Sequence, residues 1–375
     1  MHIQGDSGVA YLGQTTTTPH SNDLIHNRVC LPTYASQRIV SRGGSIERTI
    51  LMRTQGSSES DRSSSIVHRR EAEPIVIDCL HGIFSLAILV DGKHVVSGGV
   101  EGKIRRWRIE DGEEVGTPMD VGSPVRSIAV SRDGRWIVGG TKTGWLTVWD
   151  AESHSKVTEF KAHRDWVLAV DISPDTTKIA TGSSDNTACV WSLSTGERLL
   201  GPLKHEHRVV AVKYSPDGRL IATATRSVRV YDSQDGSLLT EFLVKVNSSL
   251  NYSLAWASDS KQLFALSHDG YIFRVDVSAQ TTLSKWHIHT SNDPMCIALA
   301  SDGTFIAASA GSSVSFWSTT SQKQIGTVIE YTHKVWSMAM SSNCDLVISG
   351  DKQITLRALC GTRNPPYVHD NVSNW

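Results

Sequence analysis

The chain has 375 residues and a formal net charge of −1, because Lys and Arg are balanced by Asp and Glu. A balanced charge argues against binding to DNA or RNA, since recognition of phosphates needs a concentrated basic surface. The longest apolar stretch, Ile83–Val90, is far shorter than the roughly 20 residues of a membrane span. The N-terminal residues do not show a basic start followed by an apolar run, so we expect no secretory signal. The composition therefore predicts neither nucleic acid nor membrane as a partner.

The cysteines are few and irregularly spaced, with no Cys-x-x-Cys pair: Cys30, Cys79, Cys189, Cys296, Cys344 and Cys360. A disulfide framework or a zinc site would need patterned spacing. We therefore expect reduced thiols in an intracellular compartment, the cytoplasm in the first place, with the nucleus as the alternative.

Residues 1–73 differ from the rest of the chain. They contain no Lys and no Trp but 18 Ser or Thr, and they show no sustained helical or strand period. Too little apolar surface is available to offset chain entropy, so we expect a mostly disordered segment. Two weakly apolar patches, Val29–Val40 and Ile46–Met52, are exceptions that could dock on a partner. The segment is either a regulated linker or an extension without a function of its own.

From about residue 75 the sequence repeats one unit. Its clearest copies are 127–150, 168–192 and 210–232, in which alternating apolar runs are separated by turns built on Asp-Gly or Pro-Asp. This pattern is typical of short antiparallel strands. The end of the third strand recurs every 40 to 44 residues, at Trp107, Trp149, Trp191, Tyr231, Val275, Trp317 and Arg357.

Repeat length and strand content fit the blade of a β-propeller, because a lone sheet cannot bury both of its faces whereas a closed circle of sheets can. We predict an all-β, seven-bladed propeller of four-stranded antiparallel blades over 74–363. A C-terminal tail would then occupy 364–375. The strand-like run Ile75–Ile77 is expected to pair with the last copy and to join the two ends of the ring. A monomer is expected.

The unit resembles the WD repeat of β-transducin-like proteins, and the expanded fungal families of such repeats in particular. The third copy carries the four polar positions of that family: His163, Thr181, Asp185 and Trp191. The resemblance implies a structural tetrad that is hydrogen-bonded across the blade. Other copies depart from it, since Thr143 replaces the Asp in the second copy and Arg357 replaces the Trp in the last.

Motifs for catalysis or cofactors are weak. The string 97–107 lacks P-loop spacing, because three residues instead of four separate Gly98 from Gly102. The pairs His205/His207 and His287/His289 have no visible third metal ligand, and no GxSxG elbow occurs. We predict no catalytic residue, cofactor or metal.

The start of the innermost strands is the best candidate for binding. Aligning the copies brings six charged or aromatic residues to this rim: Arg164, Asp165, Trp166, Arg208, Lys334 and Trp336. Trp and Arg are enriched at interaction hot spots, and a rigid rim loses little entropy on binding. The alternative is that the two Trp residues only fill space between blades.

Four functions follow in order of preference. The first is a non-enzymatic scaffold whose propeller face binds protein or peptide partners, which the resemblance also implies. The second is a sensor module that acts in trans with a signalling ATPase, because similar repeats stand at the C-terminal end of fungal signal-transducing ATPases. A ubiquitin-ligase substrate adaptor ranks lower, since Trp149–Asp150 is followed by Ala151 and Glu152 instead of the expected Arg. An enzyme ranks last.

Overall fold

The structure is a computed structural model that describes residues 34–38, 48–52, 74–79, 81–244, 254–267, 269–288, 296–341, 346–349 and 352–357. The chain separates into two units, Met1–Glu71 and Ala72–Trp375. The expected boundary after residue 73 lies two residues from this division. The expected boundary at 363 and the tail 364–375 lie outside the described residues.

The described residues of the first unit form a strand pair. Strand β1 (Tyr34–Arg38) pairs antiparallel with β2 (Arg48–Met52). Both strands overlap the two apolar patches of this otherwise Ser/Thr-rich segment. The prediction of a mostly disordered extension did not include this pair, and the rest of that prediction lies outside the described residues.

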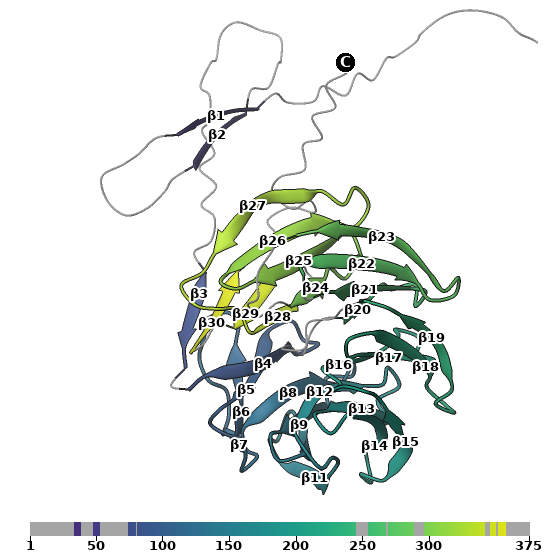
Figure 1. The fold of residues 1–375 in the computed structure, drawn as a ribbon. Coiled ribbons are helices and arrows are strands. Elements are labelled where there is room, and N and C mark those ends of the chain that lie inside the picture. Colours follow the sequence, from purple (N-terminus) through teal and green to yellow (C-terminus); the bar gives the residue numbers. More distant parts are fainter. Residues whose placement is uncertain are drawn as a thin grey trace, which may run out of the picture. The chain divides into compact units, whose positions relative to one another are not determined.

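The second unit consists of four-stranded antiparallel sheets (Figure 1). We call a sheet of four consecutive strands a blade. Blade 1 has β4 (Ile83–Ile88), β5 (His94–Gly99), β6 (Lys103–Arg108) and β7 (Met119–Asp120). Blade 2 has β8 (Val125–Val130), β9 (Trp136–Thr141), β10 (Trp145–Asp150) and β11 (Lys156–Lys161). Blade 3 has β12 (Val167–Ile172), β13 (Lys178–Ser183), β14 (Thr187–Ser192) and β15 (Arg198–Lys204).

Three further blades follow the same order. Blade 4 has β16 (Ala211–Tyr214), β17 (Leu220–Ala224), β18 (Val228–Asp232) and β19 (Leu238–Phe242). Blade 5 has β20 (Leu254–Trp256), β21 (Gln262–Leu266), β22 (Tyr271–Asp276) and β23 (Thr281–His287). Blade 6 has β24 (Ile297–Leu299), β25 (Phe305–Ala310), β26 (Ser313–Ser318) and β27 (Gln324–Glu330).

The last sheet is built differently, and here the prediction of a seven-bladed propeller is wrong. Six blades, not seven, are formed by four consecutive strands. The remaining strands β28 (Ser337–Met340), β29 (Leu346–Ser349) and β30 (Gln353–Arg357) take β3 (Ile75–Asp78) as their fourth strand. We call this composite the closing sheet. Its physical reason is that the chain enters the ring on an outer strand, so that both ends of the repeat region share one sheet.

The predicted pairing of Ile75–Ile77 with the last copy is confirmed. Ile75 lies opposite Leu356 and Ile77 opposite Ile354, and Figure 1 shows β3 beside β30. The innermost strands contact one another in the order β4, β8, β12, β16, β20, β24, β28 and again β4. The four-stranded sheets therefore form a closed circle.

The apolar core lies between neighbouring sheets. One cluster joins the closing sheet to blade 1 and includes Ile77, Leu86, Trp107 and Ile354. Another joins blades 1 and 2, and further clusters join the sheets around the ring. The expected turns hold the first two strands of a blade in register. In blade 2, Asp133 Oδ1 accepts from the Arg135 N–H at 3.0 Å and Ser131 Oγ accepts from the Trp136 N–H at 2.8 Å.

We predict that β3 stabilises the whole ring. Deleting 74–80 should lower Tm by many degrees, because it removes the outer strand of the closing sheet and apolar surface from its core. Replacing the buried Ile77 by Ala should cost about 2–4 kcal/mol of unfolding free energy. The matched control is Val76→Ala on the opposite, exposed face of the strand, which should cost no more than about 0.5 kcal/mol. Equal losses in denaturant unfolding would contradict this role.

Candidate interaction face

Blade 3 brings the four predicted tetrad residues together. The Trp191 indole N–H donates to Thr181 Oγ1 at 2.9 Å, and His163 Nε2 lies 2.7 Å from the same oxygen. On the other side of the imidazole ring, Nδ1 lies 3.0 Å from Asp185 Oδ2. Every polar group in this buried row therefore has a partner, as a blade interior requires.

Asp185 is held ionised in this row. Burial alone would raise the pKa of its carboxyl, but hydrogen bonds from His163 and Thr187 outweigh burial and hold the pKa well below its usual range. The same carboxylate accepts from the backbone N–H of Arg164 at 3.0 Å. The tetrad therefore fixes the loop that leads into β12.

The loop before β12 displays three of the predicted rim residues. Arg164, Asp165 and Trp166 are exposed, and Asp165 Oδ1 accepts from the Trp166 N–H at 2.8 Å. Close packing against the turn of blade 2 also fixes this loop. Gly144 has a φ of 80°, and a Cβ there would lie 2.3 Å from the carbonyl oxygen of His163, so only glycine fits.

A row of aromatic and cationic side chains runs along the rim from this loop. Lys142 Nζ lies 4.4 Å from the centroid of the Trp166 ring and 5.9 Å from that of Phe84. The guanidinium of Arg126 lies 4.8 Å from the Phe84 centroid. Phe84 meets Trp336 edge to face at 6.5 Å between centroids. We call Trp336, Phe84, Arg126, Lys142 and Trp166 the rim row; such contacts favour fixed side-chain positions.

Local backbone geometry explains why Phe84 and Arg126 point to the rim. Each is the extra residue of a β-bulge at the start of an innermost strand, where the register shifts between Ile83 and Ser85 and between Val125 and Ser127. A bulge leaves its extra residue outside the ladder and re-aims its side chain. The equivalent residue of blade 3, Leu168, is buried in the apolar core instead.

The rim row connects two of the six rim residues predicted from the sequence, Trp166 and Trp336. The other predicted positions, Arg164, Asp165, Arg208 and Lys334, are exposed at the starts of innermost strands. Sequence reasoning missed Phe84, Arg126 and Lys142. Phe84 and Arg126 each follow the first apolar residue of an innermost strand. An alignment of all copies at that position would have found both.

The tetrad positions vary in the other blades. In blade 2, Gly139 stands where blade 3 has Thr181, and the buried Trp149 indole N–H finds no hydrogen-bond partner among the described residues. In blade 4, His205 Nε2 lies 3.5 Å from the Tyr231 hydroxyl, and Glu241 binds Arg229 at 3.0 Å. Burial, followed by the nearby charge of Arg229, lowers the pKa of His205 to about 4.

Across the described part of the chain, no three or more His, Cys, Asp or Glu side chains are grouped so that they could hold a metal ion. Over the same residues, no helix has the length and apolar character needed to cross a membrane.

These observations define the class of the protein as a WD-repeat-like β-propeller. The family model described as the IFT122 first beta-propeller matches residues 82–359, and the chain belongs to this family. The match begins after β3 and ends two residues after β30. No curated protein matches the chain. The resemblance to fungal repeat families stays a prediction.

Replacing Thr181 by Val should destabilise the protein by about 2–3 kcal/mol. The change leaves the buried Trp191 N–H and His163 Nε2 without their shared partner while it keeps side-chain volume. Thr147→Val is the matched control, because the equally buried Thr147 makes one long hydrogen bond of 3.4 Å to Gly139 O. Denaturant unfolding would contradict the tetrad's role if both variants lost the same free energy.

His205 should make stability depend on pH. Its folded-state pKa of about 4 lies below the ordinary value of 6.5, so the unfolded chain takes up a proton first as the pH falls. The unfolding free energy therefore does not depend on His205 protonation above pH 6.5. Between pH 6.5 and pH 4 it falls as the pH falls, by at most about 1.4 kcal/mol per pH unit. Comparison with His205→Gln isolates this effect from the carboxylates. Parallel curves of unfolding free energy against pH for the two proteins would disprove it.

Proposed function

We propose that this chain is a non-enzymatic interaction scaffold whose propeller rim binds protein or peptide partners. The rim row supports this proposal. It combines an exposed Trp166 and the half-buried Lys142 with the half-buried rings of Phe84 and Trp336, and the buried guanidinium of Arg126 supports Phe84 from the side. Aromatic and guanidinium groups of this kind dominate the binding energy of protein interfaces.

The rim is suited to binding because its side chains are already fixed. Phe84, Arg126 and Trp166 stand at or directly before the starts of β4, β8 and β12, whose ladders and inter-sheet contacts hold the backbone in place. Lys142 directly follows β9, and Trp336 directly precedes β28. Ring–cation contacts then limit the rotamers of the long side chains. Binding therefore needs little further ordering, which favours affinity from a small surface.

A binding role agrees with the chemistry of the cysteines. Burial raises the pKa of Cys79 and Cys296 to about 12 and that of Cys189 to about 11. The thiolate is the nucleophilic form, so burial suppresses nucleophilic chemistry at all three. All three are unpaired thiols, which supports our inference of a reducing, intracellular location, the cytoplasm before the nucleus.

The alternative functions differ from the scaffold in the partner that the rim row would bind. A sensor module acting in trans with a signalling ATPase would use the rim row to bind that ATPase. A ubiquitin-ligase adaptor would need a second surface for the ligase, and Ala151–Glu152 after Trp149–Asp150 supplies no Arg for it. A crosslinking pull-down that recovers an ATPase would favour the sensor module.

The test compares two triple variants of the full chain. Lys142→Ala, Arg164→Ala and Trp166→Ala together remove exposed or half-exposed rim side chains, so partner recovery in proximity labelling should fall at least tenfold with little change in Tm. The control replaces exposed apolar residues of outer strands, Leu199, Leu283 and Val328, by Ala. If only the control variant loses its partners, the binding surface lies on the outer strands and the proposal is wrong.

A further inference from the structure

One position before the innermost strands of blades 1 to 4 is fixed by a recurrent backbone hydrogen bond. Its N–H donates to a carbonyl in the turn of the preceding sheet. The bonds are Cys79 to Lys352 O at 2.6 Å, Val121 to Gly102 O at 2.9 Å, His163 to Gly144 O at 3.0 Å and His205 to Asn186 O at 2.9 Å. Cys79 therefore occupies in blade 1 the place that His163 occupies in blade 3.

The other three tetrad places of blade 1 keep their chemistry. Ser97, Glu101 and Trp107 stand where blade 3 has Thr181, Asp185 and Trp191. The Trp107 indole N–H donates to Ser97 Oγ at 2.8 Å, which matches the 2.9 Å bond of blade 3. Blade 1 thus has a tetrad without its imidazole ring.

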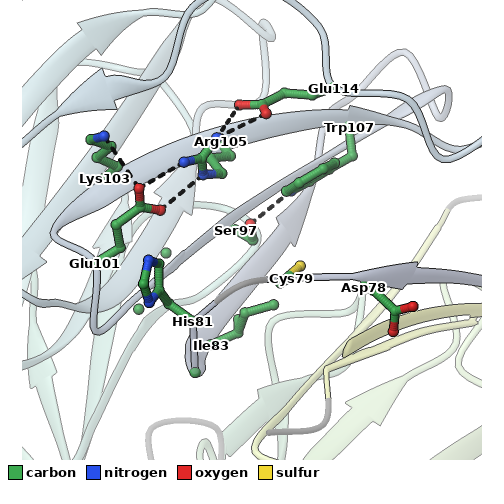
Figure 2. Close-up of a pocket in the computed structure, with 13 residues that line it drawn as sticks. Asp78, Cys79, His81, Ile83, Ser97, Glu101, Lys103, Arg105, Trp107 and Glu114 are labelled. Carbon is green, nitrogen blue, oxygen red and sulfur yellow. Dashed lines mark hydrogen bonds and ion pairs between the residues drawn. The ribbon is translucent and has the colours of Figure 1, made fainter. Parts of the chain in front are cut away.

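A cavity of about 270 Å³ lies at this place, and its lining includes Cys79, Ser97, Glu101, Arg105 and Trp107. Figure 2 shows Arg105 between Glu101 and Glu114, together with the Trp107–Ser97 hydrogen bond. The cavity reaches the surface through exposed lining residues, among them His81 and Glu114.

The polar walls of the cavity are ready for a ligand that both donates and accepts. Hydrogen bonds from Arg105 at 2.7 and 2.9 Å hold the pKa of Glu101 below its usual range, so its carboxylate is an ionised acceptor. The buried Ser97 hydroxyl accepts from Trp107, and its own hydrogen has no acceptor among the described residues. Arg105 already binds both glutamates, which disfavours an anionic ligand.

Cys79 does not complete the row. Its short side chain lies 3.8 Å from the carbonyl oxygen of Ile77, within its own strand segment, instead of reaching across the blade. In blade 3 the ring of His163 spans the gap between the acid and the hydroxyl, with 3.0 Å on one side and 2.7 Å on the other.

We propose that the blade 1 cavity is a binding site for an imidazole ring, supplied by a histidine side chain of a partner protein. One ring nitrogen donates to the Glu101 carboxylate, and the other accepts from the Ser97 hydroxyl. The identity of the donor as a protein rests on the proposed scaffold function. Binding of a free imidazole ring does not rest on it.

The experiment titrates imidazole into the full chain at constant pH and follows the Trp107 indole N–H by NMR, with the signal assigned through Trp107→Phe. A saturable shift is expected, with a dissociation constant on the order of millimolar for so small a ligand. Cys79→His should abolish the shift and raise Tm, because the linked ring fills the cavity. The matched control Cys79→Ala should retain binding, and Ser97→Ala should weaken it several-fold.

A wild-type Trp107 signal that does not saturate, or an equal shift in Cys79→His, would overturn the proposal. If Cys79→His does not fold, 1-methylimidazole decides the matter on the wild-type chain. That ring cannot donate to Glu101, so it should bind at least several-fold more weakly than imidazole, and equal binding would refute the assigned contacts. The rim triple variant should bind imidazole like the wild type, which separates a failure here from a failure of the scaffold function.

Discussion

Burial of each sheet against its two neighbours is the constraint on which the rest of this structure depends. The core clusters lie between sheets, so no sheet covers its own apolar faces. Hydrogen bonds reinforce these contacts near the axis. Ser337 Oγ accepts from the Leu86 N–H at 3.3 Å, Ser85 Oγ from Ile128 at 3.0 Å and Ser127 Oγ from Val170 at 3.1 Å. The same link thus crosses from the closing sheet to blade 1 and onward to blade 3.

Blade 3 shows how this link survives a substitution. Ala169 stands where blades 1 and 2 have serine, and Asp171 instead accepts from the Tyr214 N–H at 2.8 Å and pairs with Lys213 at 2.9 Å. The propeller tolerates such exchanges because each interface between sheets has two requirements. It needs a hydrogen-bond acceptor for a backbone N–H and it needs apolar contact, but neither requires one particular side chain. By the same argument the tetrads could be lost from several blades without opening the circle, since they act within a blade and not between blades.

Much of the fold could be predicted from the sequence, because alternation and turn residues are local signals that recur about every 42 residues. The pairing of β3 with β30 could be predicted because Ile75–Ile77 is a strand-like run with no other partner. The number of blades was predicted wrongly, since a repeat count treats all copies as equal although the last copy supplies only three strands of its sheet. The β1–β2 pair was missed because its short apolar patches are too brief to give a period. Phe84, Arg126 and Lys142 were missed for another reason: they come from separate repeats, and only the circle brings them into contact.

The blades of this propeller differ in function where a blade departs from the repeat pattern. At the place before the innermost strand, blade 3 has His163 in a complete tetrad, blade 2 has Val121 in an apolar core, and blade 4 has His205 against a tyrosine. Blade 1 has Cys79 and a cavity. An apolar replacement removes the need for polar partners. In blade 1, Arg105 and Lys103 already pair with Glu101, but the buried Ser97 hydroxyl keeps its need for an acceptor without the imidazole ring of the complete tetrad. Buried polar groups are normally paired, so a blade that retains three members of such a row is more consistent with an external fourth member than with simple decay of the repeat.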